Sequence, residues 1–429
     1  MHIRNEGQSV PKLSIYEYFF CVLTAIAAFL KMSPYFTWNA GNLLSIIYNV
    51  GFSSIAIALG LIICKNKVRT EMLLSAAFIF LFGFYVCISG GYSLSSSVTN
   101  LVMYALISIF ILLRKEVKIQ TFKYFYKIFA LSLLPAIIVF IFQFFGGNLP
   151  YNIIQPINAL KASYGHFYIQ YFGSVFYSTG LNNSYFCGMM DEPGLIGTFS
   201  GLFLVARMMV SNLKNKKNKI SIFDLLLFTG GLFSQSKAFL FILIFAFILK
   251  LAMMKNFKGM IGIVFVIILG IIFLNIKTDY EPLVKIQSII YQYEQTHTLQ
   301  LFRTTDSFEE EFNMFLNGDI GKVFFGNGYM SSQHVVAFFG SAEIRMLIYD
   351  IGFVGVTLLF IWLVLSTISQ NSNKHKLVPS VLIFLFAFLL SMIQRQYVTT
   401  LDYIVILFGG STYVSNCIIQ NYKTITEGV

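Results

Sequence analysis

The chain has 429 residues, of which 57% are apolar and only 11% are charged, whereas soluble domains average about 45–50% and about 25%. A soluble protein of this length could not bury so much apolar surface in one core, so the composition excludes that class and predicts a chain solvated by lipid. The net charge of +11 does not indicate nucleic-acid binding, because the basic residues form short clusters between apolar stretches and no basic patch is interleaved with aromatic residues.

Twelve apolar stretches are candidate membrane-spanning helices. In chain order they cover residues 13–31, 43–63, 72–90, 98–113, 126–146, 194–211, 221–235, 238–254, 260–275, 344–368, 378–394 and 400–418. They show no alternation of polar and apolar residues, which argues against an outer-membrane barrel. The first stretch follows a basic start but lacks a small-residue cleavage site, so we expect a retained span. The sequence therefore predicts an all-α polytopic integral membrane protein, with about 12 transmembrane helices in a single transmembrane domain over residues 1–429.

The distribution of charge predicts the orientation. If the N-terminus is cytoplasmic, 21 of the 30 Lys and Arg residues fall on the cytoplasmic side, and every basic cluster lies in a turn on that side. Cytoplasmic loops of membrane proteins carry such an excess of positive charge. We therefore predict a multi-pass protein with both termini in the cytoplasm.

Two longer segments fall on the opposite side of the membrane. Residues 147–193 form a smaller loop, polar and aromatic with little charge, and residues 276–343 form a large loop of 68 residues with a net charge of −5. The large loop carries helix signals: apolar residues recur at helical spacing over 283–293, and Asp306 followed by Glu309 is typical of a helix start. The apolar face of this second helix is predicted from Phe308, Phe312, Phe315 and Leu316, with a stop at Asn317-Gly318. We expect a folded, partly helical loop.

Ionisable residues at membrane depth are costly, which makes each of them a functional candidate. Asp191 and Glu192 stand out because they open a predicted span ahead of Pro193. Stabilisation of a helix N-terminus by negative charge explains part of this pattern, and a carboxylate acting as a base at the mouth of a cavity is the functional alternative. The other candidates are Lys237, Arg345, Asp350, Arg395 and Asp402. For Arg395 and Asp402 the simpler interpretation is a side chain that reaches the membrane interface.

The large loop contains two further candidates. Arg303 precedes the capped helix, and residues 325–329 form a Gly-rich turn that leads toward Glu343 and Arg345. Such a turn is usually only a turn, and phosphate binding is the alternative. The histidines and cysteines lack metal-ligand or catalytic spacing, and there is no P-loop or nucleotide fingerprint, so neither a metal nor a cofactor is predicted.

Three segments together resemble a known family. Residues 187–198 (CGMMDEPGLIGT) resemble the Gly-aromatic-x-(Asp)-Glu-Pro-x-x-x-Gly signature of the O-antigen and capsule repeat-unit polymerases (Wzy type). Residues 232–238 resemble their Leu-Ser-x-Ser-Arg/Lys segment, and the large loop with Arg303 followed by residues 325–328 and 348–355 resembles their closing pattern. The resemblance covers about residues 185–356, and the first 140 residues match only as hydrophobic spans.

The sequence also departs from that family. Tyr185-Phe186 stands where many relatives have an arginine. The related O-antigen ligases carry a histidine shortly before the closing Gly-x-x-Gly, and residues 341–345 contain none. The chain therefore resembles a polymerase more than a ligase.

The resemblance implies a glycosyltransferase at the periplasmic face of the bacterial inner membrane. A growing glycan on undecaprenyl diphosphate, held within the membrane lipid, is transferred to a new lipid-linked oligosaccharide unit, and a polysaccharide chain-length regulator is a candidate partner. A diphosphate leaving group needs cations, for which Arg303, Arg345 and Lys237 are the candidates. The expected catalytic residues are Glu192, Arg303 and Glu343, and those expected to bind substrate are Asp191, Tyr164 and Tyr185.

Two other functions stay open as alternatives. An O-antigen ligase would use the same kind of lipid-linked donor. A lipid-linked oligosaccharide flippase would be expected to show two related halves around a charged central path. The single long loop in the C-terminal third gives this chain an asymmetry that favours the polymerase.

Overall fold

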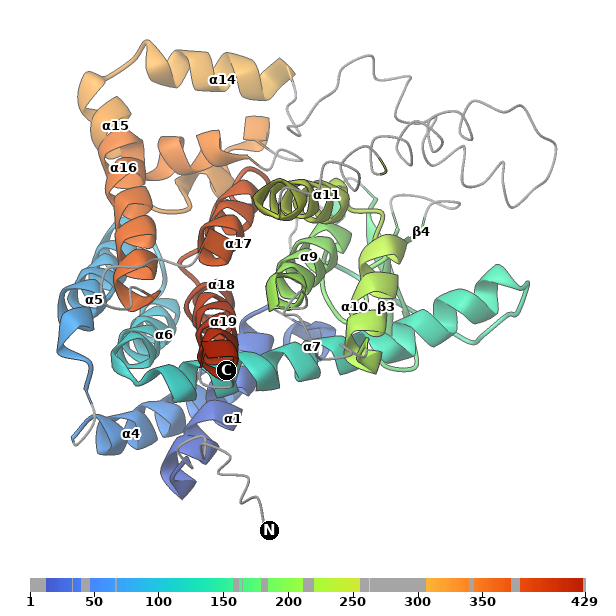
Figure 1. Ribbon diagram of the computed structural model, residues 1–429. Coiled ribbons are helices and arrows are strands. Elements are labelled where there is room, and N and C mark those ends of the chain that lie inside the picture. The colour runs from blue at the N-terminus through green and yellow to red at the C-terminus, as the bar shows by residue number, and fades with distance from the viewer. Residues whose placement is uncertain are drawn as a thin grey trace.

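The computed structural model describes residues 13–32, 34–39, 47–65, 68–156, 162–163, 165–178, 184–210, 220–254, 262, 306–338, 343–371 and 379–426 (Figure 1). This part of the chain is mostly helical. Its N-terminal half contains α1 (Ile15–Lys31), α2 (Tyr35–Asn39), the π-helix η1 (Ile47–Gly51), α4 (Phe52–Cys64), the short η2 (Thr70–Met72), α5 (Leu73–Ser89), α6 (Leu94–Leu112) and α7 (Lys115–Phe144). The helices after residue 192 are α9 (Pro193–Val210), α10 (Ile222–Phe233), α11 (Lys237–Met253), α14 (Asp306–Leu316), α15 (Ile320–Phe325), η3 (Ser331–His334), η4 (Val336–Phe338), α16 (Ile344–Asn371), α17 (Pro379–Ser391), α18 (Leu401–Ile404), η5 (Val405–Gly410) and α19 (Ser411–Thr426).

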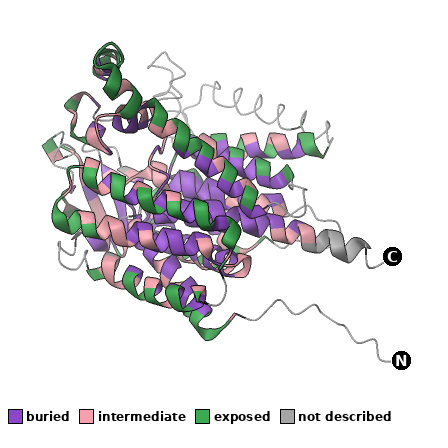
Figure 2. Cartoon of the chain, turned by 90° about the vertical axis from the view of Figure 1, so that its left-hand side faces the viewer, coloured by how far each residue is buried: buried purple, intermediate pink, exposed green. Residues whose placement is uncertain are grey.

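Eleven of the predicted apolar stretches contain a helix in the described residues, and of the stretch 260–275 the structure describes only residue 262. Within the described part of the chain, six helices are long and apolar enough to cross a membrane: Thr70–Ser89, Leu94–Leu112, Lys115–Phe144, Pro193–Val210, Ile344–Asn371 and Leu401–Ile419. Many outward-facing side chains are large and apolar, such as Leu74, Ile88 and Leu94, each 83% exposed (Figure 2). The helical membrane class is therefore supported, and the count of about 12 spans stays a prediction.

The ends of the helices fall into two groups by their contacts. Arg69, which precedes α5, donates a backbone hydrogen bond to Leu112 at the end of α6 and contacts the carbonyl of Gln370 near the end of α16. At the other end of α5, the Ser89 hydroxyl accepts a hydrogen bond from the amide of Tyr329. These contacts place residues 69, 112 and 370 together at one end of α5 and residue 329 at the other.

Two acidic residues that cap helices also join those helices to their neighbours. Ser14 and Glu17 cap α1 reciprocally, and the Glu17 carboxylate pairs with Arg114 ahead of α7 at 2.6 Å. Ser221 and Asp224 cap α10 in the same way, and Asp224 pairs with Arg207 of α9 at 3.1 Å. Each acid thus satisfies helix-end amides and fixes the position of the next helix.

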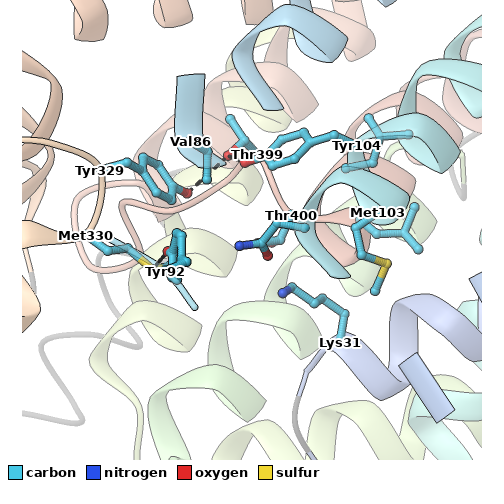
Figure 3. A pocket seen from close by; sticks show the side chains of 12 residues that line it. Lys31, Val86, Tyr92, Met103, Tyr104, Tyr329, Met330, Thr399 and Thr400 are labelled. Atoms are coloured by element: carbon cyan, nitrogen blue, oxygen red, sulfur yellow. Dashed lines mark hydrogen bonds between the residues drawn. The ribbon is translucent and has the colours of Figure 1, made fainter. Parts of the chain in front are cut away.

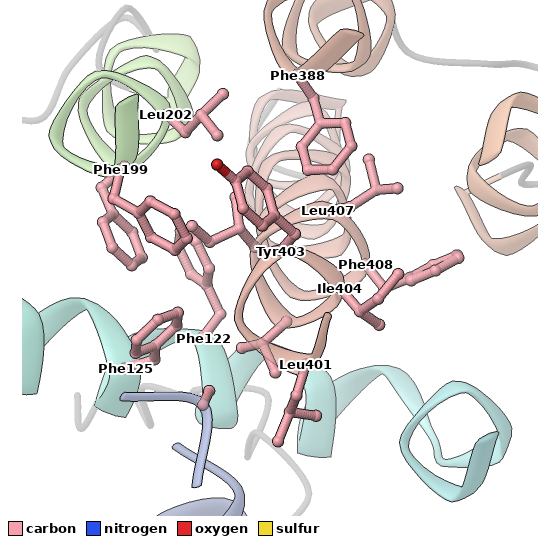
Figure 4. Packing of buried hydrophobic residues seen from close by; sticks show 14 of the residues in the cluster. Phe122, Phe125, Phe199, Leu202, Phe388, Leu401, Tyr403, Ile404, Leu407 and Phe408 are labelled. Atoms are coloured by element: carbon pink, nitrogen blue, oxygen red, sulfur yellow. The ribbon is translucent and has the colours of Figure 1, made fainter. Parts of the chain in front are cut away.

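The continuous helical run of α18, η5 and α19 is the core of the bundle. Within an apolar stretch of 18 residues in Leu401–Ile419, 83% of the residues are buried, and Figure 4 shows Tyr403, Ile404 and Leu407 packed among α7, α9 and α17. Gly409 lets α7 approach closely, because a β-carbon there would lie 2.8 Å from Cβ of Phe122. Small residues permit such close helix packing within membranes.

The expectation of an all-α chain is wrong in one segment. Residues 147–193 contain a four-stranded antiparallel sheet in the order β1 (Asn152–Ile154), β2 (Phe167–Tyr171), β3 (Ser174–Ser178) and β4 (Ser184–Phe186). Aromatic and branched residues, which favour strands, dominate it, and Gly173, with φ of +70°, closes the two-residue turn between β2 and β3. Phe176 and Phe186 pack against Phe140 of α7, which fixes the sheet on the bundle.

The predicted helix of the large loop is confirmed as α14. Phe308, Phe312 and Phe315 form its buried face, whereas Leu316 is 39% exposed and lies outside that face. The amide of Asn317 donates to the carbonyl of Asn313 at the predicted stop. In Figure 1, α14 and α15 lie beside one end of α16. The amphipathic helix predicted over 283–293 lies outside the described residues.

Candidate functional site

The predicted Glu192 forms an ion pair that the sequence did not indicate. Its Oε2 lies 2.6 Å from Nη2 of Arg395, which belongs to the segment 392–400 between α17 and α18. The Glu192 side chain is 31% exposed and that of Arg395 is 23% exposed, so both groups are partly accessible. A β-carbon at position 194 would lie 2.9 Å from the same Nη2, so glycine leaves room for the guanidinium.

Arg395 was among the ionisable candidates, but the sequence favoured a side chain that reaches the interface, and the ion pair with Glu192 corrects that interpretation. Burial disfavours its charged form, but the combined attraction of Glu192, Tyr403 and Asp191 outweighs burial and raises the pKa of Arg395 above its usual value. The guanidinium stays charged at every physiological pH. The sequence feature that could have drawn attention to Arg395 is that it is the only charged residue within 392–400.

The segment 392–400 also contacts α16. The Tyr397 hydroxyl donates to Oδ2 of Asp350 at 2.6 Å, and the same carboxylate accepts hydrogen bonds from the amides of Met330 and Ser332 and from the Ser331 hydroxyl. Asp350 is fully buried, and these four donors satisfy both of its oxygens. The geometry therefore favours a structural role for Asp350, which holds residues 330–332 and the segment 392–400 against α16.

The Gly-rich turn packs against the second glycine motif. The amides of Asn327 and Gly328 donate to the carbonyls of Tyr349 and Asp350 at 3.0 and 2.9 Å. Gly352 breaks the helical conformation of α16 with φ of +68°, and a β-carbon there would lie 2.1 Å from the carbonyl oxygen of Phe324. Because these two amides are engaged by α16, the geometry favours packing over the phosphate alternative for the turn.

Glu343 and Arg345 lie together, but their groups are largely satisfied. The Arg345 guanidinium donates to both oxygens of Glu343, at 2.7 and 2.9 Å, and to both oxygens of Glu309 at 2.8 Å. It also stacks over the ring of Phe308 at 4.8 Å. Glu343 is only 1% exposed. Two carboxylates already compensate this one cation, so the geometry favours docking of α14 on α16. The predicted diphosphate role of Arg345 and catalytic role of Glu343 stay predictions.

Lys237 and Asp191 lie on elements that flank the Glu192–Arg395 pair. Lys237 is the exposed first residue of α11, and the turn before it packs on α9, where a β-carbon at Gly197 would lie 2.1 Å from Cβ of Ser236. The backbone carbonyl of Asp191 accepts a hydrogen bond of 2.7 Å from the hydroxyl of Tyr168 in β2. The sheet is thereby fixed beside the start of α9.

The remaining predicted residues are only partly placed. Tyr185 lies on β4, opposite Tyr177 of β3. Arg303 and Tyr164 lie outside the described residues, so their proposed roles stay predictions. Among the residues that the structure describes, no three His, Cys, Asp or Glu side chains are arranged to hold a metal ion.

A small cavity with polar and apolar walls lies beside Thr399 and Thr400 of the segment 392–400 (Figure 3). Lys31 points into it, and Tyr104 and Tyr329 share hydrogen bonds with the Thr399 hydroxyl at 3.1 and 3.3 Å. Its volume of about 30 Å³ suits ordered water and is too small for a sugar ring. Among the residues of the segment 392–400, Thr399 and Thr400 line this cavity.

Asp402 also differs from the sequence-based interpretation. Its side chain is only 4% exposed, at the start of α18, and does not reach the interface. Its Oδ1 accepts no hydrogen bond from any residue in the described part of the chain, and its charge interacts with that of Lys31. Lys31 and Asp402 thus attract each other next to the segment that carries Arg395.

The segment 392–400 thus connects the candidate residues. Arg395 contacts Glu192, Gln396 contacts Met346 next to Arg345, and Tyr397 contacts Asp350. Chemically, the accessible pair of Glu192 and Arg395 offers a carboxylate that can accept a proton and a guanidinium that can bind a phosphate oxygen.

Comparison of the chain with protein-family models, with characterised proteins and with solved structures gives no match. The resemblance to repeat-unit polymerases therefore rests on the sequence motifs alone.

Proposed function

We propose that this protein polymerises oligosaccharide repeat units linked to undecaprenyl diphosphate at the periplasmic face of the inner membrane. In this proposal the growing glycan moves from its lipid carrier to a new lipid-linked unit, as in O-antigen or related surface polysaccharide synthesis. The observation that carries the proposal is the ion pair between Glu192, in the polymerase-like motif, and Arg395. An acid and a cation side by side suit a reaction with a hydroxyl nucleophile and a diphosphate leaving group.

The proposed reaction assigns one role to each member of the pair. A sugar hydroxyl of the incoming unit attacks the anomeric carbon of the growing glycan, and Glu192 accepts the hydroxyl proton. The bond from the anomeric carbon to the diphosphate oxygen breaks, and undecaprenyl diphosphate leaves with the electron pair. Arg395 stabilises the negative charge that develops on that oxygen, with Arg303 and Lys237 as the further candidate cations.

The association of Glu192 with Arg395 also gives the free enzyme a resting state. Without substrate the two charges neutralise each other at 2.6 Å. Arrival of a diphosphate gives Arg395 a competing anionic partner, which releases the Glu192 carboxylate to act as a base. Binding of the donor would thereby activate the residue that deprotonates the acceptor.

The test is deletion of the gene in the source bacterium and complementation with Glu192→Gln and Arg395→Lys. Both substitutions keep the approximate size of the side chain and change its chemistry. We expect one repeat unit on the lipid-linked or core acceptor in place of a ladder, because loss of a group that stabilises the transition state costs about 10²–10³ in rate. Arg69→Gln is the matched control: Arg69 is also ion-paired, with Glu71, but lies at the opposite end of α5 from the Ser89–Tyr329 contact.

A lipopolysaccharide gel of these strains, on which glycans of increasing chain length form a ladder, distinguishes the alternatives. Lipid-linked polymer that is not transferred would indicate a ligase, and absence of any repeat unit on the outer leaflet would indicate a flippase. A normal ladder in the deletion strain would refute the polymerase. A normal ladder with both variants, at protein levels equal to the unaltered chain by immunoblot, would refute the site.

A further inference from the structure

A second cavity lies at the other end of the bundle from Glu192. It has a volume of about 210 Å³ and lies between α7, α9, the start of α10 and α19. Arg207 lines it from the last turn of α9. At a rise of about 1.5 Å per residue, the axis of α9 separates Arg207 from Glu192 by roughly 20 Å. This basic cavity is therefore distinct from the candidate site.

Three cations line the basic cavity, and only one of them has an acidic partner. Arg207 pairs with Asp224 at 3.1 Å and donates to the hydroxyl of Tyr413 at 2.8 Å. Lys123 and Lys127 lie on the same face of α7, four residues apart. Neither has a carboxylate partner among the residues that the structure describes. With one acid against three bases, the local charge is +2.

Aromatic rings hold these cations at the wall of the cavity. Lys123 lies over the ring of Tyr413 at 5.8 Å, and Lys127 lies over that of Phe223 at 5.9 Å. The two lysines are exposed, and ammonium donors without a carboxylate partner suit the oxygens of a phosphate. The cavity thus offers an anion both charge and hydrogen-bond donors.

The surface beyond the cavity favours an anion attached to acyl chains. Ile222, Leu225 and Phe228 follow along α10 and are 62, 52 and 46% exposed, and Leu131 of α7 is 51% exposed. This apolar surface continues along two helices that pack together. Basic pockets between transmembrane helices at a membrane surface suit lipid head groups. A free phosphate would use the cations and leave the apolar surface without a role.

We propose that the basic cavity binds the phosphate of an acidic phospholipid, with its acyl chains along α7 and α10. The lysines contact the phosphate oxygens, and Arg207 stays paired with Asp224 and shapes the wall. The bound lipid would fasten α7, α9, α10 and α19 together at this end of the bundle. This proposal does not depend on the glycan reaction.

The experiment uses the full chain purified in a neutral detergent. Binding of phosphatidylglycerol is measured by native mass spectrometry and by the shift in thermal unfolding, with phosphatidylcholine as the uncharged comparison. For the double variant Lys123→Gln/Lys127→Gln we expect binding roughly 10-fold weaker, because each lysine near a charged lipid surface contributes measurably. The matched control is Lys65→Gln/Lys115→Gln, which removes two lysines that do not line the cavity.

Each outcome decides for or against the proposal. Selective binding of phosphatidylglycerol that the double variant weakens and the control keeps would support it. Equal binding of phosphatidylcholine would overturn it, as would equal affinity in the double variant and the control. Inorganic phosphate that stabilises the chain as well as the lipid does would show a free-anion site instead. Since all readouts are binding and unfolding, loss of polymer synthesis does not affect them.

Discussion

Gly326 and Gly352 face each other where the large loop crosses α16. Their φ angles are +83° and +68°, and a β-carbon on either would lie 2.1 Å from a carbonyl oxygen of the opposite segment. Both the left-handed conformation and the close backbone contact require glycine. The sequence displays both motifs, but their mutual packing is invisible in it, because nothing local to residue 326 identifies residue 352 as its neighbour.

We expect Gly326→Ala and Gly352→Ala each to lower the free energy of unfolding by about 2–4 kcal/mol, since backbone strain and overpacking add. Thermal or denaturant unfolding of the purified chain in detergent measures this. Gly51→Ala is the control, because no atom lies within 4 Å of a β-carbon there and its φ is −61°. If neither Gly326→Ala nor Gly352→Ala lowered the free energy of unfolding, the close contact between the large loop and α16 would be contradicted.

At the scale of elements, the docking of α14 depends on one charged contact beside its aromatic face. The hydrogen bonds from Arg345 lower the pKa of Glu309 below its usual range. Because the folded-state pKa is the lower one, the contact stabilises the docked helix above the ordinary glutamate pKa of about 4.3. That stabilisation is lost as the pH falls through the folded-state value.

Glu309→Gln should therefore weaken the docking of α14 at neutral pH, as acidification does in the unaltered chain. Glu309 is 46% exposed, so we expect a loss of about 0.5–1 kcal/mol, or roughly two- to five-fold faster hydrogen exchange in α14. Exchange is expressed relative to the intrinsic rate at each pH. The adjacent, exposed Glu310→Gln is the control, and equal exchange in both variants would show that the contact contributes nothing.

The elements differ in how well sequence predicts them. Long apolar runs made α5, α16 and their neighbours predictable, because a helix must satisfy its own backbone in lipid. The apolar spacing of Phe308, Phe312 and Phe315 likewise predicted α14 and its stop at Asn317-Gly318. The sheet was not predicted, since strands of three to five residues carry little periodic signal.

For the whole molecule, membrane orientation remains the central prediction. After replacement of the five native cysteines by serine, Asn317→Cys should react with a membrane-impermeant maleimide in intact spheroplasts. Lys123→Cys should react only after the membrane is opened. Both positions are exposed in the structure, so differences in burial do not explain such a result. Labelling of both from the same side would refute the orientation derived from charge.

The candidate site shows where prediction from sequence stops. Glu192 was identified because two acids ahead of Pro193 are unusual at a helix start in a membrane protein. Arg395 was a candidate too, but it was not recognised as the partner of Glu192, because a single arginine beyond a span has a simpler explanation as an interface residue. Only the three-dimensional arrangement, in which α17 returns the chain beside α9, joins the two charges.

The burial of Leu401–Ile419 has a consequence for biosynthesis. This helix is translated after every other described helix on which it packs, so α1, α7, α9 and α17 enter the membrane while the groove that it fills is still open. Until then Phe122, Phe125 and Phe199, all fully packed in the finished protein, lack part of their neighbours. A nascent chain interrupted before residue 401 would therefore be a loosely assembled substrate for membrane proteases, however well its earlier helices had inserted.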